Sequence, residues 1–203
     1  MMESMEGLTD EVKKHRKPDY GITPLLVNRW SPRAMTGEKI DDGELMALFE
    51  AARWAPSAFN GQLWRFIYAK RDTRHWDRIF ALLGEWNQNW CRNAAVLVVI
   101  VTRKLFEYND KPSRTCAFDC GAAWENLALE GTARGLVVHG MSGFGYERAR
   151  EELGIPEKFG VMAMCAIGRR APKDALPEDM QEKEFPKGRR PLEEIVMEGK
   201  FRS

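Results

Sequence analysis

Hydrophobic and polar residues alternate along this chain in blocks that predict helices and strands in turn. Between residues 45 and 52, apolar side chains recur every three to four positions, which is the spacing of one helix face. Asp41 and Asp42 are suited to cap the start of this helix, because a carboxylate accepts hydrogen bonds from its first N–H groups. Pro56 ends it, since the residue before a proline avoids the helical conformation.

A longer helix is predicted downstream by a stripe of small and apolar residues, and this helix ends at Gly135. The stripe consists of Cys120, Ala123, Trp124, Leu127, Ala128 and Gly131. Gly131 lacks a side chain and is expected to permit close packing against a neighbouring element. Shorter helices are predicted over residues 74–84 and 146–153, and Gly154 ends the second.

Runs of apolar, aromatic and β-branched residues predict the strands. They cover residues 64–69, 94–101, 136–139 and 161–167. The run at 94–101 is continuously apolar, which is typical of a central strand whose two faces are both covered. The chain therefore mixes helices and strands within one α+β arrangement.

One domain over residues 1–203 is predicted, because no internal repeat, linker or low-complexity block divides the sequence. Residues 1–20 are polar and are interpreted as an arm that is flexible. Residues 169–203 are interpreted as an extended tail, since proline and charge replace periodicity after Arg169. A structureless stretch of this length is unusual inside a compact domain.

The charge of the chain is nearly balanced, with 31 Lys and Arg against 30 Asp and Glu and a net charge of +1. No global field therefore recruits nucleic acid or a membrane surface, and any anion site has to be a local cluster. Residues 1–20 carry alternating charges without the apolar core of a secretory signal. The apolar run at 94–101 is too short to cross a bilayer. We expect a cytoplasmic protein with neither nucleic acid nor membrane as a partner.

The four cysteines show no paired zinc or redox spacing, and reduced, mostly buried thiols are expected. They are Cys91, Cys116, Cys120 and Cys165. His139 is the last residue of a predicted strand, where a satisfied hydrogen bond is commoner than a role in proton transfer. No Ser-His-Asp or Cys-His arrangement is present, so no catalytic side chain and no metal site are nominated.

Two segments carry the candidate chemistry. Arg29-Trp30-Ser31-Pro32-Arg33 offers two guanidinium groups and a hydroxyl, which suit a phosphate and a polyol. The stretch from Pro56 to Trp64 is rich in side-chain amide and hydroxyl groups and lies between a predicted helix and strand. Such groups can recognise the polar edge of a flat heterocycle. Together the segments indicate a phosphorylated, planar cofactor, and flavin mononucleotide (FMN) fits this description.

These segments resemble the FMN-dependent nitroreductase family, whose members carry Arg-x-Ser-x-Arg/Lys followed by Pro-Ser-x-x-Asn-x-Gln-Pro-Trp. The second segment here reads Pro-Ser-Ala-Phe-Asn-Gly-Gln-Leu-Trp, so Leu63 replaces the usual proline. The similarity extends from about Leu26 to the C-terminus. It implies an α+β nitroreductase-like fold with a central, mainly antiparallel sheet flanked by helices. It also implies a homodimer that binds FMN at the interface, with the C-terminal tail wrapping the partner.

The resemblance implies a phosphate site made of residues far apart in the sequence. Arg29 is expected near the phosphate, and Ser31 near the phosphate or the ribityl chain. Lys187 and Arg189 match the family's basic C-terminal segment and are expected at the same phosphate, with Arg190 left open. Trp30 departs from the small or basic residue usual there, and either lines the pocket or packs.

The isoalloxazine ring is implied to contact three further segments and Arg33. Arg33 matches a family cation that stabilises charge on the N1–C2=O side of the reduced ring. The first segment is the loop with Pro56, Ser57, Ala58 and Asn60. The second is Asn87, implied at the pyrimidine edge, with Gln88 or Asn89 as substitutes. The third is the turn with Met141, Ser142 and Gly143, in which Ser142 or Gly143 would direct a backbone N–H at N5.

The resulting hypothesis is an FMN-dependent oxidoreductase that uses NADH or NADPH in a ping-pong scheme. A nitroaromatic, a quinone or a similar electron-poor small molecule would be the acceptor. Alternatives are a relative specialised for dehalogenation or flavin destruction, and a flavin-binding redox sensor or FMN store without turnover. The aromatic residues Phe106, Tyr108 and Phe118 either stack on the acceptor or belong to the core.

Overall fold

The computed structural model describes residues 5–202, and the chain divides into two compact units. The first unit joins the N-terminal segment up to Trp30 to the C-terminal segment from Phe185, and the second spans Ser31–Glu184. Residues 1–4 of the predicted arm lie outside the described residues. The single domain over 1–203 and the flexibility of its arm stay predictions.

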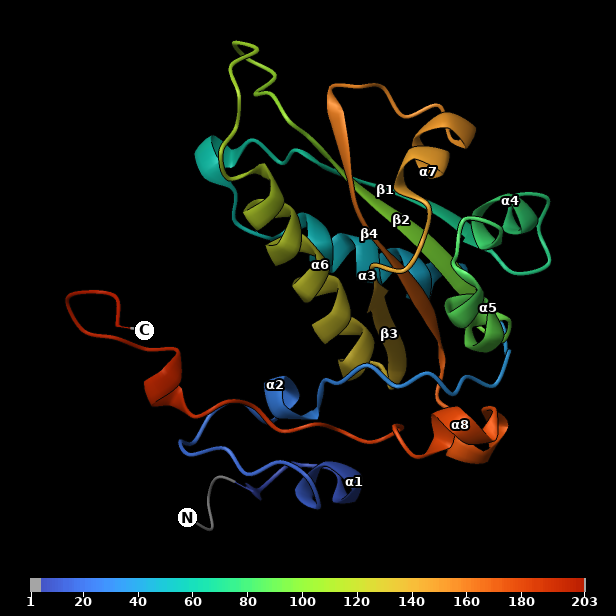
Figure 1. Ribbon diagram of the computed structural model, residues 1–203, viewed down its shortest axis with the longest axis vertical. Helices are drawn as coiled ribbons and strands as arrows, with labels where there is room; N and C mark the ends of the chain where they lie inside the picture. Colours follow the sequence, from blue (N-terminus) through green and yellow to red (C-terminus); the bar gives the residue numbers. More distant parts are fainter. Residues whose placement is uncertain (1–4, 203) are drawn as a thin grey trace. The chain divides into compact units, whose positions relative to one another are not determined.

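The second unit is built on a sheet of four strands within residues 31–184: β1 (Trp64–Lys70), β2 (Val96–Arg103), β4 (Phe159–Arg169) and β3 (Leu136–Met141). Their order is β1-β2-β4-β3, and every neighbouring pair is antiparallel (Figure 1). The predicted α+β class with a mainly antiparallel sheet is therefore confirmed. The continuous apolar run lies in β2, which is a central strand as expected.

Helices cover both faces of this sheet. Helices α3 (Asp42–Arg53) and α6 (Cys116–Ala133) pack on one face, where Val96, Val98 and Ile100 of β2 join their core. The other face packs against α4 (Trp76–Phe80), α5 (Glu85–Cys91) and α7 (Tyr146–Glu152). Because successive β2 side chains alternate between the two cores, the whole strand has to be apolar.

The strongest local predictions agree with the structure. Asp41 caps α3, because its carboxylate accepts from the N–H groups of Gly43 and Glu44. Helix α6 gives way to a left-handed backbone at Gly135, with a φ of 71°, and Gly154 after α7 has a φ of 63°. Side chains are strained in this region of φ, so glycine is favoured at both positions.

The predicted helix over residues 74–84 is wrong in length. Only Trp76–Phe80 is helical, because the chain then leaves the helix to bond a distant turn. Gly145 N donates to Leu82 O at 2.9 Å, and Gly84 N donates to Gly143 O at 2.9 Å. The helix α5 that follows was not predicted. The sequence there looks like a polar loop, although Trp90 and Cys91 are buried on its inner face.

The stretch after β4 forms short helices and 3-10 turns. The second unit ends with a 3-10 turn at Lys173–Ala175 and with α8 (Glu178–Gln181), whose Met180 is buried. In the first unit, α1 (Asp10–Lys13) and α2 (Pro24–Asn28) enclose a small core of Leu8, Val12 and Val27. The C-terminal segment contributes a 3-10 turn at Leu192–Glu194.

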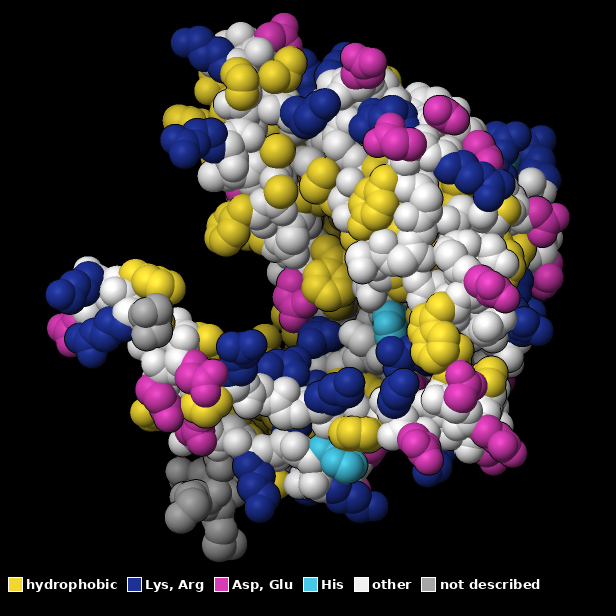
Figure 2. All heavy atoms as spheres, in the orientation of Figure 1, with side chains coloured by type: hydrophobic (Ala, Val, Ile, Leu, Met, Phe, Trp, Pro, Cys, Tyr) yellow, Lys and Arg dark blue, Asp and Glu magenta, His cyan; other side chains and the backbone are white. Residues whose placement is uncertain are grey.

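Among residues 5–202, none of the helices combines the length and the hydrophobicity that crossing a bilayer requires. Charged side chains of both signs are interspersed over the visible surface of the second unit (Figure 2). This distribution matches the nearly balanced composition.

The packing of α6 against β3 generates a testable prediction. A Cβ at Gly131 would lie 2.5 Å from Val138 Cγ2, so Gly131→Ala is expected to lower the free energy of unfolding by about 1–3 kcal/mol. Gly121→Ala in the same helix is the matched control. No neighbouring atom lies within 4 Å of its added methyl group, and we expect it to raise this free energy by about 0.5–1 kcal/mol.

Urea unfolding followed by circular dichroism measures both variants. Equal effects of the two substitutions on the unfolding free energy would contradict the close approach of α6 and β3.

Candidate functional site

The first unit gathers the cationic residues that the sequence predicts for a phosphate. The connecting residue is Arg16, whose side chain is buried. Its Nη1 donates to Val27 O at 2.5 Å and to Arg29 O at 2.8 Å, and its Nε donates to Lys187 O at 2.9 Å. Arg189 Nη1 donates to the same Lys187 oxygen at 3.2 Å. The structure therefore brings the backbone of Arg29 and of Lys187 to Arg16, and it places the charges of Arg29 and Arg189 close enough to act on it.

This group is rich in positive charge, and three of its members lack an acidic partner among the described residues. Within residues 5–202, no carboxylate lies within 4.0 Å of the charged nitrogens of Arg16, Lys187 or Arg189. Arg190 differs, because its guanidinium pairs with Glu194. The pKa of Arg16 is lowered to about 10. Burial is the largest cause, and the positive charges of Arg189 and Arg29 add to it. Lys and Arg side chains also crowd the surface around α2 and the C-terminal segment in Figure 2.

The chemistry of these donors fits a phosphate group. A dianionic phosphate accepts several charge-assisted hydrogen bonds and relieves the mutual repulsion of cations around it. An isolated surface lysine or arginine would have neither a buried cationic neighbour nor this crowding. We call Arg16, Arg29, Lys187 and Arg189 the cationic cluster.

In the second unit, Glu184 fixes the part of the first motif that contains Arg33. Its side chain is fully buried, and its Oε1 accepts from the backbone N–H groups of Arg33 at 2.8 Å and Ala34 at 2.9 Å. Arg170 pairs with Oε1, whereas Arg33 Nη1 lies 3.8 Å from Oε2. Among the described residues, Oε2 has no hydrogen-bond partner. The arrangement holds the Arg33 backbone firmly and leaves its guanidinium at the edge of the ion pair.

His139 within β3 fixes the same segment from its other side. Its Nδ1 lies 2.9 Å from Pro32 O. A carbonyl oxygen only accepts, so Nδ1 carries the proton. The ring also packs on Trp90, with 4.5 Å between ring centroids. Burial lowers the pKa of His139 to about 4, an effect that outweighs the favourable Pro32 carbonyl, and Arg33 lowers it further. His139 is therefore neutral at pH 7.

Asn87 on α5 holds the turn after β3. Its Nδ2 donates to Gly143 O at 2.9 Å, and its Oδ1 accepts from Trp90 Nε1 at 3.1 Å. Gln88 instead donates to Leu83 O at 2.7 Å. Ser142 and Gly143 are exposed, whereas Met141 is buried with its Sδ 3.4 Å from Cys91 Sγ. Of the three amides considered at this position, Asn87 is the one that contacts the predicted turn.

The loop between α3 and β1 is held by a buried carboxylate on α6. Asp119 Oδ2 accepts from Ala58 N at 3.0 Å, and Ser57 Oγ accepts from Gln62 N at 3.1 Å. Phe59, Asn60 and Gln62 have φ values of 53°, 53° and 46°. Positive φ at residues other than glycine is unfavourable and persists where neighbouring contacts impose it, frequently at binding sites. These contacts hold the loop, which contains a 3-10 turn at Ala58–Asn60, in one backbone conformation.

Aromatic side chains extend from this loop. Phe59 is 81% exposed and packs edge-on against Phe106, with 5.7 Å between their ring centroids. Tyr108 lies against Phe106 at 5.5 Å and is also exposed. Phe106 is buried, so it belongs to the core side of this group, whereas Phe118 on α6 is exposed. These exposed rings are available to a flat ligand or to another protein surface.

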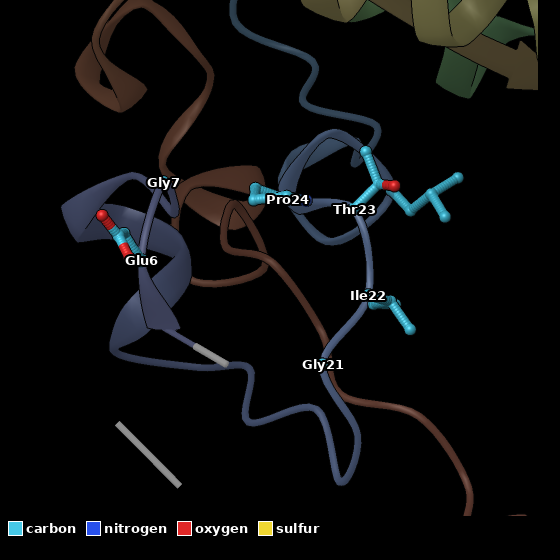
Figure 3. Close-up of a pocket in the computed structure, with 7 residues that line it drawn as sticks. Glu6, Gly7, Gly21, Ile22, Thr23 and Pro24 are labelled. Carbon is cyan, nitrogen blue, oxygen red and sulfur yellow. The ribbon is translucent and has the colours of Figure 1, made fainter. Parts of the chain in front are cut away.

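A pocket in the first unit contains none of the residues predicted for the cofactor. It has a volume of about 720 Å³, and Figure 3 shows Glu6 and Gly7 on one side and the stretch Gly21–Pro24 on the other. Glu6 is the one charged side chain among the residues that line it. A carboxylate repels a phosphate, so we do not place the cofactor there.

Several predicted residues have other surroundings. Trp30 packs against the small core of the first unit, which is the second of its two expected roles. Pro56 and Asn60 are exposed, whereas Ser31, Ser57 and Ala58 are half-buried. The binding roles of these residues stay predictions. Sequence reasoning missed Arg16, Glu184 and Asp119, because each acts on the backbone of a distant segment and has no motif of its own.

The cysteines are thiols in the structure. All four are unpaired, and Cys91, Cys120 and Cys165 are buried. Burial raises the pKa of Cys91 beyond its usual range and the pKa of Cys120 and of Cys165 to about 12. Among residues 5–202, no group of three or more His, Cys, Asp and Glu is placed to hold a metal ion.

The comparisons with known proteins point to one family. The model of the nitroreductase family matches residues 26–89 and 77–169. A protein of Archaeoglobus fulgidus, provisionally named NADH dehydrogenase/NAD(P)H nitroreductase, is 30% identical over 154 residues, which are 74% of this chain and 84% of that protein.

Solved structures agree in fold. A crystal structure described as an oxidoreductase containing FMN is 42% identical, has a TM-score of 0.89 and is matched over 92% of this chain and 96% of its own. A nitroreductase from Desulfovibrio desulfuricans, named provisionally and solved in complex with FMN, is 24% identical with a TM-score of 0.69. That match covers 89% of this chain and 99% of the other. At this identity the second structure supports the fold alone.

The environment of His139 predicts a pH-dependent stability. Unfolded histidine takes up a proton near pH 6.5, whereas folded His139 does so only near pH 4. Between these values the unfolded state binds more protons, so the free energy of unfolding falls as the pH falls. Going from pH 7 to pH 5 is expected to cost about 2 kcal/mol through this residue.

The measurement is urea unfolding at pH 7 and pH 5 for the wild type and for His139→Asn, which stays neutral. The variant is expected to lose about 2 kcal/mol less than the wild type over this range. His75→Asn, at an exposed position, is the control and should behave as the wild type does. An identical pH dependence of wild type and His139→Asn would contradict the buried neutral imidazole.

Proposed function

Because this chain belongs to the nitroreductase family, we propose that it is an FMN-dependent oxidoreductase that transfers hydride from NADH or NADPH to an electron-poor acceptor. The acceptor class is a nitroaromatic, a quinone or a similar small molecule. The two substrates occupy the site in turn, in a ping-pong scheme.

The observation that carries this proposal is the cationic cluster of the first unit. A doubly charged phosphate is the part of FMN that needs several cations, and three members of the cluster have no acidic partner within residues 5–202. Support also comes from the 42% identical oxidoreductase, which is described as containing FMN. We assign Arg29, Lys187 and Arg189 to the phosphate, and Ser31 to the phosphate or the ribityl chain.

Bound FMN supplies a carrier that accepts and releases two electrons as a hydride equivalent. We assign the isoalloxazine to residues of the second unit whose backbone is held by hydrogen bonds from neighbouring side chains. Arg33, fixed by Glu184, provides positive charge for the N1–C2=O side of the ring. The loop at Ser57–Asn60, fixed by Asp119, and the turn at Ser142–Gly143, fixed by Asn87, provide backbone and side-chain contacts.

No side chain is assigned to proton transfer. His139 is neutral at pH 7, and its Nδ1 proton is used on Pro32 O, which makes it a support for the Arg33 segment. The protein therefore binds and orients the flavin and its substrates and tunes the reduction potential of the ring, while protons come from water.

We further propose a homodimer in the cytoplasm. Ile195, Val196 and Phe201 of the C-terminal segment are 60%, 66% and 84% exposed, which is unfavourable unless another surface covers them. A tail that wraps a second copy of the chain would bury these side chains. The four unpaired cysteines support a reducing compartment.

The decisive experiment compares the absorption spectrum of the purified protein with its anaerobic reaction in a stopped-flow instrument. We expect flavin absorption bands, and bleaching of these bands by NADH or NADPH. Addition of a quinone or a nitroaromatic should then restore them. A colourless protein that cannot be reconstituted with FMN contradicts the proposal. Bound flavin that neither nucleotide reduces would favour a redox sensor or an FMN store.

A second prediction concerns Arg33. Arg33→Gln keeps a hydrogen-bond donor and removes the charge, so the two-electron midpoint potential of bound flavin should fall by about 30–60 mV. Arg170→Gln is the matched control, because Arg170 also pairs with Glu184 but is not assigned to the ring. Equilibration with reference dyes measures both potentials. Equal shifts would indicate a general loss of charge and would remove Arg33 from its assigned place.

A further inference from the structure

Through its planar guanidinium group, Arg16 joins its own segment to two other segments of the first unit. The carbonyl oxygens that it binds belong to Val27, Arg29 and Lys187. Lys187 is 171 residues away in the sequence, so this bond ties the C-terminal segment to the N-terminal one. Together these contacts fix the backbone at Arg29 and at Lys187, which carry two of the side chains assigned to the phosphate.

The geometry of these contacts is specific to arginine. A guanidinium presents five N–H groups in a fixed plane, whereas a lysine ammonium is a compact point charge on a flexible stem. Arg16 donates from Nε to Lys187 O and from Nη1 to Arg29 O, so it bonds the C-terminal and the N-terminal segment at the same time. A lysine at this position would keep the charge but could not hold all three oxygens in the same arrangement.

The position of Arg16 is costly without an anion nearby. A buried cation loses hydration, and the neighbouring charges of Arg189 and Arg29 disfavour it further. Arg16 nevertheless stays charged at pH 7, because a pKa of about 10 lies well above that pH. Its positive charge therefore adds to the potential that an incoming phosphate experiences, although its Nε and Nη1 groups are engaged with the backbone.

We infer that Arg16 is a positioning residue that makes this protein select the phosphorylated flavin over riboflavin. It acts by holding the backbone at Arg29 and Lys187 so that the cationic cluster forms before the ligand binds. The inference rests on the proposed function. It attributes the preference for a phosphate-bearing ligand to one residue that lies outside the motifs.

The test compares dissociation constants of FMN and riboflavin for the full-length apoprotein, measured by quenching of flavin fluorescence. In the wild type, FMN should bind more tightly than riboflavin. Arg16→Lys should weaken FMN binding about tenfold and leave riboflavin binding within about twofold. Arg16→Met should weaken FMN binding further. Lys17→Met is the matched control, because it removes one positive charge at the adjacent, exposed position, and it should not change the ratio of the two constants.

The outcomes separate the inference from the function on which it rests. Equal affinities of the wild type for FMN and riboflavin would refute the assignment of the cluster to a phosphate, whatever the variants do. A wild type that prefers FMN, with the same preference in Arg16→Lys, would overturn the role of Arg16 alone. Equal weakening of both flavins in Arg16→Lys would make Arg16 merely structural and would also overturn it.

A measurement on the wild type covers the case in which the variants do not fold. The Nε–H proton of Arg16, assigned by triple-resonance NMR in the apoprotein, should exchange slowly with solvent because it is bonded to Lys187 O. Its signal should shift on addition of FMN and not on addition of riboflavin. Fast exchange, or the same shift with both flavins, would contradict the inference.

Discussion

Positive charge gathered in one small unit is the constraint on which the proposed chemistry depends. Arg16 is buried beside Arg29 and Arg189, and its hydrogen bonds go to carbonyl oxygens where a structural arginine more often pairs with a carboxylate. Such a group is stable in the folded chain only at a cost in electrostatic repulsion. A phosphate bound there, as we propose, would offset this repulsion.

In the second unit, acidic and amide side chains, not cations, hold the loops in place. Three buried or half-buried side chains, Glu184, Asp119 and Asn87, bond the backbone of segments that lie outside the sheet and the longer helices. Loops held in this way lose little entropy when a ligand binds. The rigid sheet beneath them comes from β2, whose side chains enter both cores in alternation. The surface that we assign to the flavin ring is thus made of loops and fixed by packed elements.

Local patterns predicted the elements whose causes are local. The cap at Asp41, the apolar run of β2 and the glycine after α6 each depend on a few neighbouring residues, and each is confirmed. The prediction failed between residues 74 and 91. There the chain stops one helix early and starts another, because the backbone of Gly84 and Leu82 bonds the turn at residues 143–145. Periodicity in one segment contains no information about such a partner.

The sequence by itself determined the fold class, the order of most strands and helices, and the residue types of two motifs that indicate a flavin phosphate and ring. Only the tertiary structure decided which charged residues matter beyond those motifs. Arg16 reaches a carbonyl 171 positions away, Glu184 a backbone N–H 151 positions away, and Asp119 one 61 positions away. In the sequence these three look like ordinary solvated charges. Their roles arise because folding buries them next to backbone groups that need a partner, and burial makes each such bond obligatory.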